Sequence, residues 1–184
     1  MKHLTLILGG SHSGKSRYAL ECGKNLARGS NPSVSPDTDG TRKYFLATAQ
    51  ALDEKMVTQI EACKKERSSD WITIEESIKV PDVIGFLHNR TDVLVIDCLT
   101  LWLSNLLLTR HDYDIEKEAG LFLSMIKRVD YSVIVVSSET GCGIVPPDPI
   151  SRLFCDTLGP IHQKLSALAN DLYFMVAGRP LRVG

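Results

Sequence analysis

A chain of 184 residues with 43% hydrophobic and 23% charged side chains can bury a sizeable core and suits one domain. Its formal net charge of −1 offers no electrostatic footprint for nucleic acid or an anionic membrane, so we expect small-molecule partners and no nucleic acid. Five cysteines without C-x-x-C spacing argue against both a zinc site and a disulfide framework.

Two apolar stretches could be mistaken for targeting or membrane segments. The residues between His3 and Gly9 are too few for the apolar region of a signal peptide. The longer run at 93–108 contains Asp97 and is shorter than a membrane span. The sequence therefore predicts a cytoplasmic protein with no membrane span.

The N-terminal segment has the pattern of a buried strand, a phosphate-binding loop and a helix. The apolar run at 4–8 leads into Gly-Gly-Ser-His-Ser-Gly-Lys-Ser at 9–16, which matches G-x-x-x-x-G-K-[ST]. Glycine at the two motif positions lets several backbone N–H groups converge on a polyphosphate, and the helix N-terminus adds partial positive charge. The predicted nucleotide-binding residues are Gly9, Gly10, Ser11, His12, Ser13, Gly14, Lys15, Ser16 and Arg17.

Three side chains of this loop have specific expected roles. Lys15 is predicted to neutralise the β- and γ-phosphates of ATP or GTP, and the Ser16 hydroxyl is predicted to bind Mg²⁺. His12 contributes its backbone N–H in either case, while its side chain either donates to a phosphate oxygen or points to solvent.

Beyond the loop, predicted helices and strands alternate along the chain. Helices are expected over 17–27, 53–67, 77–89, 99–108, 114–128 and 149–170, and strands over 44–49, 71–74, 93–97 and 131–137, with a closing hairpin at 172–183. Ser77 is the predicted cap of the third helix, which has Pro81 in its first turn. Residues 28–43 are rich in Gly, Pro, Ser and Thr, so they predict a flexible insertion. The alternation predicts one P-loop nucleotide-binding domain over 1–184, with a doubly wound, mainly parallel α/β sheet and an antiparallel C-terminal edge.

Asp97 ends the continuous apolar run at 93–96, which is the pattern of a central parallel strand. Ligands of open α/β sheets bind beyond the carboxyl ends of the strands, so Asp97 and Lys15 are predicted to face the same site. Asp97 would then be catalytic by holding magnesium, directly or through water. The alternative is that Asp97 caps the helix that begins at Leu99.

Glu139 follows the strand at 131–137 and precedes a Gly- and Pro-rich loop at 140–147. As a catalytic residue it could reach magnesium through water or act as the base for an attacked hydroxyl. The alternative is a solvated loop acid. His162 has helical spacing from apolar neighbours on the last helix, so it is predicted to be a core or interface residue.

Five separated segments, in this order, carry a resemblance to a known family. They are 9–17, Ala47-Thr48-Ala49, 97–107, 139–146 and Val176-Ala177-Gly178. With 28–43 as an insertion, the chain resembles the adenosylcobinamide kinase / adenosylcobinamide-phosphate guanylyltransferase family of cobalamin biosynthesis. The resemblance implies a RecA-like fold and a homo-oligomer, often a trimer. It also implies phosphorylation of the aminopropanol hydroxyl of adenosylcobinamide by ATP or GTP, and transfer of GMP from GTP to that phosphate with release of pyrophosphate.

The helix predicted at 53–67 departs from that family at one position. Where the family has the histidine that accepts the guanylyl group, in an I-x-x-H pattern, this chain has Ile60-Glu61-Ala62-Cys63. An imidazole attacks as a neutral nucleophile, whereas a thiol must first deprotonate. Cys63 is therefore a catalytic candidate by position and a core residue by pattern, and we expect kinase activity with weak or absent guanylylation of the protein.

Two classes of function stay open on these residues. The first is an enzyme that transfers a phosphoryl group, with or without a nucleotidyl group, to a corrinoid. The second is a nucleotide-binding regulatory protein that has lost catalysis. The intact side chains of Lys15, Ser16 and Asp97 favour the enzyme.

Overall fold

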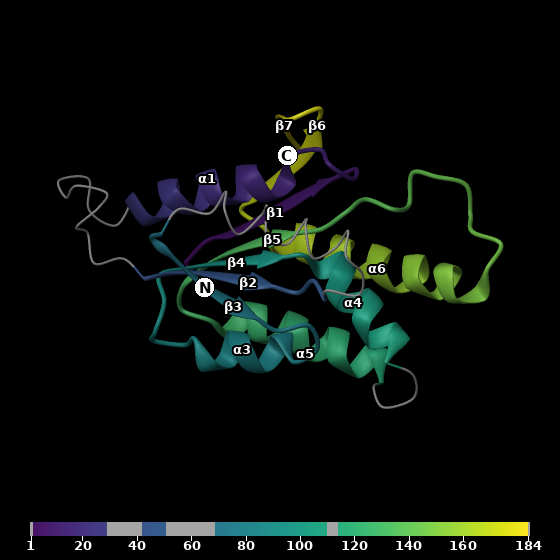
Figure 1. The fold of residues 1–184 in the computed structure, drawn as a ribbon, viewed down its shortest axis with the longest axis horizontal. Helices are drawn as coiled ribbons and strands as arrows, with labels where there is room; N and C mark the ends of the chain where they lie inside the picture. Colours follow the sequence, from purple (N-terminus) through teal and green to yellow (C-terminus); the bar gives the residue numbers. More distant parts are fainter. Residues whose placement is uncertain (1, 29–41, 51–68, 110–113, 184) are drawn as a thin grey trace.

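The computed structural model describes residues 2–28, 42–50, 69–109 and 114–183. Within these residues, seven strands form one sheet in the order β3-β2-β4-β5-β1-β6-β7 (Figure 1). The strands are β1 (Leu4–Gly9), β2 (Lys43–Ala47), β3 (Trp71–Glu75), β4 (Val93–Asp97), β5 (Ser132–Val136), β6 (Asp171–Val176) and β7 (Arg179–Arg182).

All strand pairs from β3 to β6 are parallel, and β6 pairs with β7 in the antiparallel direction. The sheet order separates β1 from β4 by one strand, β5. This arrangement confirms the predicted doubly wound, mainly parallel sheet with an antiparallel C-terminal edge. It also brings the carboxyl ends of β1, β4 and β5 to one edge of the sheet, where ligands of such sheets bind.

Helices cover both faces of the sheet. They are α1 (Lys15–Arg28), α3 (Val80–Phe86), α4 (Leu99–Leu108), α5 (Ile115–Arg128) and α6 (Pro149–Leu168). Helix α1 lies on one face, and α3 to α6 lie on the other (Figure 1). Because both faces are buried, the central strands β1, β4 and β5 are mostly apolar rather than alternately polar.

Alternate side chains of the strands enter two separate clusters, as the two-residue period of a strand requires. Leu94 and Ile96 of β4 pack in the larger cluster with α3 to α6, while Val93 and Val95 pack on the side of α1. Trp102 is fully buried in the larger cluster, where its indole N–H donates to the carbonyl of Ile78 at 2.8 Å. Burying a large apolar side chain of this kind stabilises the fold by roughly 1.5–3 kcal/mol.

The helix predicted at 77–89 is shorter at both ends, since α3 runs from Val80 to Phe86. The predicted helix 77–89 is observed as α3, whose N-cap is Lys79 rather than Ser77. The carboxylate of Glu76 accepts from the N–H groups of Ile78 and Lys79, at 2.8 and 2.9 Å, and this delays the start of the helix. Pro81 does lie in the first turn of α3, as predicted.

Two predicted segments lie outside the described residues. They are the helix expected at 53–67 and most of the insertion expected at 28–43. Of that insertion, Arg28 is the last residue of α1 and Lys43 is the first residue of β2.

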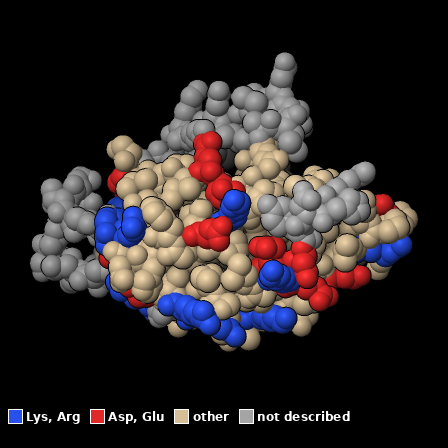
Figure 2. All heavy atoms as spheres, turned by 90° about the horizontal axis from the view of Figure 1, so that it is seen from below, with Lys and Arg blue, Asp and Glu red and all other residues tan. Residues whose placement is uncertain are grey.

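The surface beside α3 and α5 carries acidic and basic side chains close together (Figure 2). Among the helices that the structure describes, none has the length and apolar character needed to cross a membrane.

Candidate active site

The loop between β1 and α1 needs glycine at two positions because other backbone segments approach it closely. Gly9 has φ +149°, and a Cβ there would lie 2.8 Å from the Met175 carbonyl oxygen and 2.9 Å from Ser13 Oγ. Gly14 has φ +91°, and its Cβ would lie 3.3 Å from Gly178 Cα. The conformation of the loop therefore depends on the backbone around Met175 and Gly178 as well as on its own sequence.

The turn of the C-terminal hairpin supports this loop from outside. Ala177 and Gly178 both have positive φ, which is the two-residue turn that suits the twist of paired strands. The Gly178 N–H donates to the Ser13 carbonyl at 3.0 Å. The Ser13 hydroxyl is itself buried without a hydrogen-bond partner, so the loop retains a polar group that a phosphate oxygen can engage.

Lys15 lies at the start of α1 and is only 9% exposed. Its Nζ donates to the carbonyl oxygens of Gly9 and Gly10, at 3.0 and 2.6 Å. Burial lowers the pKa of the Lys15 ammonium, and the charges of Cys98 and Asp97 act in the opposite direction. The Lys15 ammonium is thus held against the loop by two backbone carbonyls, and the negative charge of Asp97 at the end of β4 favours its charged form.

Strand register fixes the height of Asp97 relative to the loop. Asp97 pairs with Val136 of β5, which in turn pairs with Ile7 of β1. The glycine-rich loop begins two residues beyond Ile7, so Asp97 ends β4 just below the level of the loop. The N-cap of α4 is Cys98, whose Sγ accepts from the Leu101 N–H at 3.4 Å. The alternative assignment of Asp97 as that cap is therefore wrong.

Thr48 and Asn105 hold the carboxyl end of β4 in place. The Thr48 hydroxyl accepts from the Cys98 N–H and donates to the Cys98 carbonyl, both at 2.8 Å. The Thr48 N–H donates to the Asp97 carbonyl at 3.0 Å, and Asn105 Nδ2 donates to the Thr48 carbonyl at 2.8 Å. All these groups are buried, so the backbone on both sides of the Asp97 side chain is fixed.

The donor set suits a magnesium ion that shares its ligands with phosphate. Ser16 and Asp97 are both partly exposed and offer hard oxygen atoms. No group of three or more His, Cys, Asp or Glu side chains that could hold a metal occurs in the described part of the chain. Magnesium commonly uses one or two protein oxygens together with phosphates and water, so these two residues fit it.

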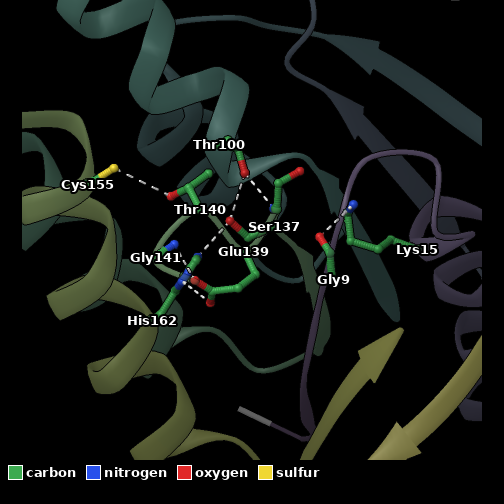
Figure 3. Close-up of polar contacts among 10 residues, drawn as sticks. Gly9, Lys15, Thr100, Ser137, Glu139, Thr140, Gly141, Cys155 and His162 are labelled. Carbon is green, nitrogen blue, oxygen red and sulfur yellow. Dashed lines mark hydrogen bonds and ion pairs between the residues drawn. The ribbon is translucent and has the colours of Figure 1, made fainter. Parts of the chain in front are cut away.

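Glu139 is bonded to the loop through its backbone, and its side chain points toward His162 of α6 (Figure 3). Its N–H donates to the Gly9 carbonyl at 3.1 Å. Its Oε1 accepts from the Gly141 N–H at 2.5 Å, and its Oε2 lies 4.0 Å from His162 Nδ1. The carboxylate is only 22% exposed, which does not agree with a freely solvated loop acid.

A comparison with known proteins agrees with this geometry. Residues 5–183 match the family described as cobinamide kinase / cobinamide phosphate guanyltransferase. The chain belongs to this family.

Two relatives of this chain are described as bifunctional adenosylcobalamin biosynthesis proteins. CobP of Pseudomonas aeruginosa is 36% identical, over 96% of this chain and 94% of the relative. CobU of Escherichia coli K12 is 28% identical, over 98% of this chain and 99% of the relative. Among solved structures, the ATPase domain of G40P aligns with a TM-score of 0.48 and 13% identity, over 94% of this chain and 69% of that domain.

The predicted site residues of this chain lie in different places. The structure brings Lys15, Asp97 and Glu139 to one edge of the sheet, with Ser16 in the first turn of α1. Gly10, Ser11, His12 and Arg17 are exposed around the loop, and His12 has φ +54°. Cys63 lies outside the described residues.

Several polar residues that organise the site have no predicted role in the sequence. Thr48 and Asn105 lie in segments that carry the family resemblance, and Ser137 follows β5 directly. A polar residue directly after a buried strand is a usable signal, because the ends of neighbouring parallel strands meet at the site. The prediction that His162 is a core residue is confirmed, since it is 8% exposed.

Proposed function

We propose that this chain is a nucleoside-triphosphate-dependent cobinamide kinase of adenosylcobalamin biosynthesis. One observation carries the proposal: the Gly9 carbonyl accepts from both the Lys15 ammonium and the Glu139 N–H. A buried cation and a carboxylate are therefore attached to the same turn of a phosphate-binding loop. Membership of the family supplies the substrate class, a corrinoid that carries a free hydroxyl.

Lys15 and Glu139 have separate roles in the proposed phosphoryl transfer. The corrinoid hydroxyl oxygen forms a bond to the γ-phosphorus, and the bond between that phosphorus and the bridging oxygen of the nucleoside diphosphate breaks. The hydroxyl proton passes to the Glu139 carboxylate. Lys15 stabilises the negative charge that develops on the phosphoryl oxygens and on the departing diphosphate. We assign Glu139 as the base because its carboxylate is oriented by the Gly141 N–H and faces His162.

Ser16 and Asp97 would hold a magnesium ion in this reaction. Magnesium would contribute positive charge against the β- and γ-phosphate oxygens. The rigid backbone that Thr48 and Asn105 give to β4 would keep the Asp97 carboxylate aimed at the phosphates. ATP and GTP are both proposed as phosphoryl donors.

Transfer of GMP from GTP to the phosphorylated corrinoid is a second candidate activity. The family description and the bifunctional relatives favour it. Cys63 stands where the resemblance implies a guanylylated histidine, so we propose that this second activity is weak in this chain.

Assembly and location are further parts of the proposal. We propose a homo-oligomer, a trimer as the family resemblance implies, and apolar side chains exposed in the loop after β5 and at the start of α6 support association. They are Ile144, Val145, Ile150 and Leu153. A cytoplasmic location is proposed because ATP and GTP are available there.

The decisive experiment supplies the purified protein with adenosylcobinamide, magnesium and either ATP or GTP. Chromatography of the corrinoids should show adenosylcobinamide phosphate accumulating in proportion to the nucleoside diphosphate released. Nucleotide binding without any new corrinoid product would favour the regulatory alternative. Hydrolysis of the nucleotide without corrinoid phosphorylation would reject the proposed acceptor.

A further inference from the structure

Four side chains from α4, α6 and the segment between β5 and α6 form a continuous line of polar contacts beside the phosphate-binding loop (Figure 3). The Ser138 N–H donates to Thr100 Oγ1 of α4 at 2.6 Å, and Thr100 Oγ1 lies 2.9 Å from Ser137 Oγ. Ser137 Oγ lies 2.7 Å from His162 Nε2 of α6. His162 Nδ1 faces Glu139 Oε2 at 4.0 Å, which completes the chain.

A neutral His162 ring allows two placements of the protons along these contacts, and only one of them suits every group. If Ser137 donated to Thr100, it would need a proton from His162 Nε2, and the neutral ring would then turn a lone pair on Nδ1 toward the Glu139 carboxylate. Two electron-rich groups would face each other without a proton. In the opposite arrangement Thr100 donates to Ser137, Ser137 donates to Nε2, and the Nδ1–H of His162 points at Glu139. The second arrangement gives every hydroxyl one donor and one acceptor role.

We propose that His162 is a positioning residue for Glu139, held by Thr100 and Ser137 as the Nδ1–H tautomer. The inference rests on the proposed function, in which Glu139 takes the proton of the attacked hydroxyl. The 4.0 Å contact is longer than a hydrogen bond, so in this structure it acts as the attraction of an N–H dipole for a carboxylate. Contacts of this kind often shorten only when the substrate is bound.

The surroundings of His162 support a neutral ring. The residue is 8% exposed, and burial lowers the pKa of its imidazole, against the opposing charge of Glu139. Helix α6 packs against α4, α5 and β1, and neither α4 nor β1 carries a titratable side chain. The charged side chains of α5 are Glu116, Lys117, Glu118, Lys127 and Arg128, of which Glu118 alone is partly buried. On α6 itself, Asp156 and Lys164 are exposed, and the partly exposed Arg152 donates to the carbonyls of Pro146 and Pro147.

Two substitutions of similar polarity separate positioning from simple burial. In His162→Asn, the side-chain amide nitrogen occupies the place of Nδ1 and can still face Glu139. In His162→Gln, the amide occupies the place of Nε2 and can still bond Ser137, but no donor remains at the Nδ1 position. We expect His162→Asn to keep most of the wild-type kcat and His162→Gln to lower kcat by about 10-fold or more, since misplacing a catalytic group by about 1 Å can cost ~10²-fold. KM for the nucleotide should stay unchanged in both, and His88→Gln, at an exposed histidine, is the matched control.

Nitrogen-15 NMR of the wild-type protein tests the tautomer without catalysis. At neutral pH the His162 ring, assigned through backbone connectivity, should carry its proton on Nδ1. A proton on Nε2, or on both nitrogens, would overturn the inference, as would a His162→Gln variant that is as active as His162→Asn. If the variants fail to fold in a melting assay, the wild-type spectrum alone decides. Absence of kinase activity in the wild type would reject the proposed function, and the spectrum would still report the tautomer.

Discussion

The Glu139 N–H donates to the Gly9 carbonyl oxygen at 3.1 Å, and this bond joins the loop after β5 to the first glycine of the phosphate-binding loop. The same oxygen accepts from Lys15 Nζ at 3.0 Å. One backbone carbonyl therefore sets the separation between the proposed base and the cation. Any change that moves Gly9 should disturb both groups together.

A methyl group at Gly9 should cost stability, whereas one at Gly10 should not. In Gly9→Ala the new Cβ meets the Met175 carbonyl at 2.8 Å, and the residue is strained at φ +149°, so we expect the free energy of unfolding to fall by about 1–3 kcal/mol. At Gly10 a Cβ meets nothing within 4 Å, so Gly10→Ala should change the free energy of unfolding by less than about 0.5 kcal/mol. Chemical denaturation of the two nucleotide-free variants measures both free energies. Equal losses would show that the close approach at Gly9 is not what constrains the loop.

Removal of the Lys15 ammonium should affect catalysis far more than folding. Lys15→Ala should lower kcat for corrinoid phosphorylation by ~10²-fold or more, because a preorganised charge against the transition state is lost. Steady-state assays of the purified variant provide the measurement, with Lys127→Ala on the exposed surface of α5 as the control. Unchanged turnover in Lys15→Ala would remove the phosphate-binding role from this loop.

Asp97→Asn should act mainly through the metal. The substitution keeps the size of the side chain but removes a negative charge that magnesium would use, so part of the lost activity should return as magnesium is raised. A magnesium titration of kcat/KM measures this, and Asp82→Asn at an exposed position of α3 is the control. An equal loss at every magnesium concentration, with normal nucleotide affinity, would give Asp97 a different role.

The second activity can be followed by covalent labelling with α-labelled GTP. The protein needs a nucleophile near the α-phosphate, and a free thiol is only about a few per cent thiolate at neutral pH. We expect little acid-labile, alkali-stable label in the wild type, none in Cys63→Ser and clear label in Cys63→His. Gel separation after acid or alkali treatment distinguishes the linkages. Strong phosphoramidate-type label in the wild type would instead indicate a histidine such as His12 or His162.

Burial of His162 should make stability depend on pH. Its pKa is lowered in the folded protein, so below the ordinary histidine pKa the unfolded chain binds a proton that the folded chain does not. The free energy of unfolding therefore falls as pH decreases through that window, and the contribution is fully present above it. Between about pH 8 and pH 5, the Tm of the wild type should drop more steeply than that of His162→Asn. Parallel Tm curves would contradict this account.

The fold class and the core of the site could be predicted from the sequence because their causes are local. The loop at 9–16 needs glycine where φ is positive, and the run at 93–96 is apolar because both faces of β4 are buried. The carboxylates Asp97 and Glu139 follow such strands, so their common edge follows from parallel pairing alone. The local residue pattern also predicted the alternation of strands and helices that the described residues show.

Contacts between distant positions were decided by the tertiary structure. Thr48 is hydrogen-bonded to Cys98, 50 positions away in the sequence, and Ser137 to His162, 25 positions away. No sequence pattern indicates that the members of either pair are in contact. The start of α3 is a further case, because the Glu76 carboxylate, and not the Ser77 hydroxyl, accepts from the N–H groups of Ile78 and Lys79. Residue types and spacing determine which groups can reach an edge of the sheet. Only packing of the helices determines which of these groups are close enough to exchange a proton or share a hydrogen bond.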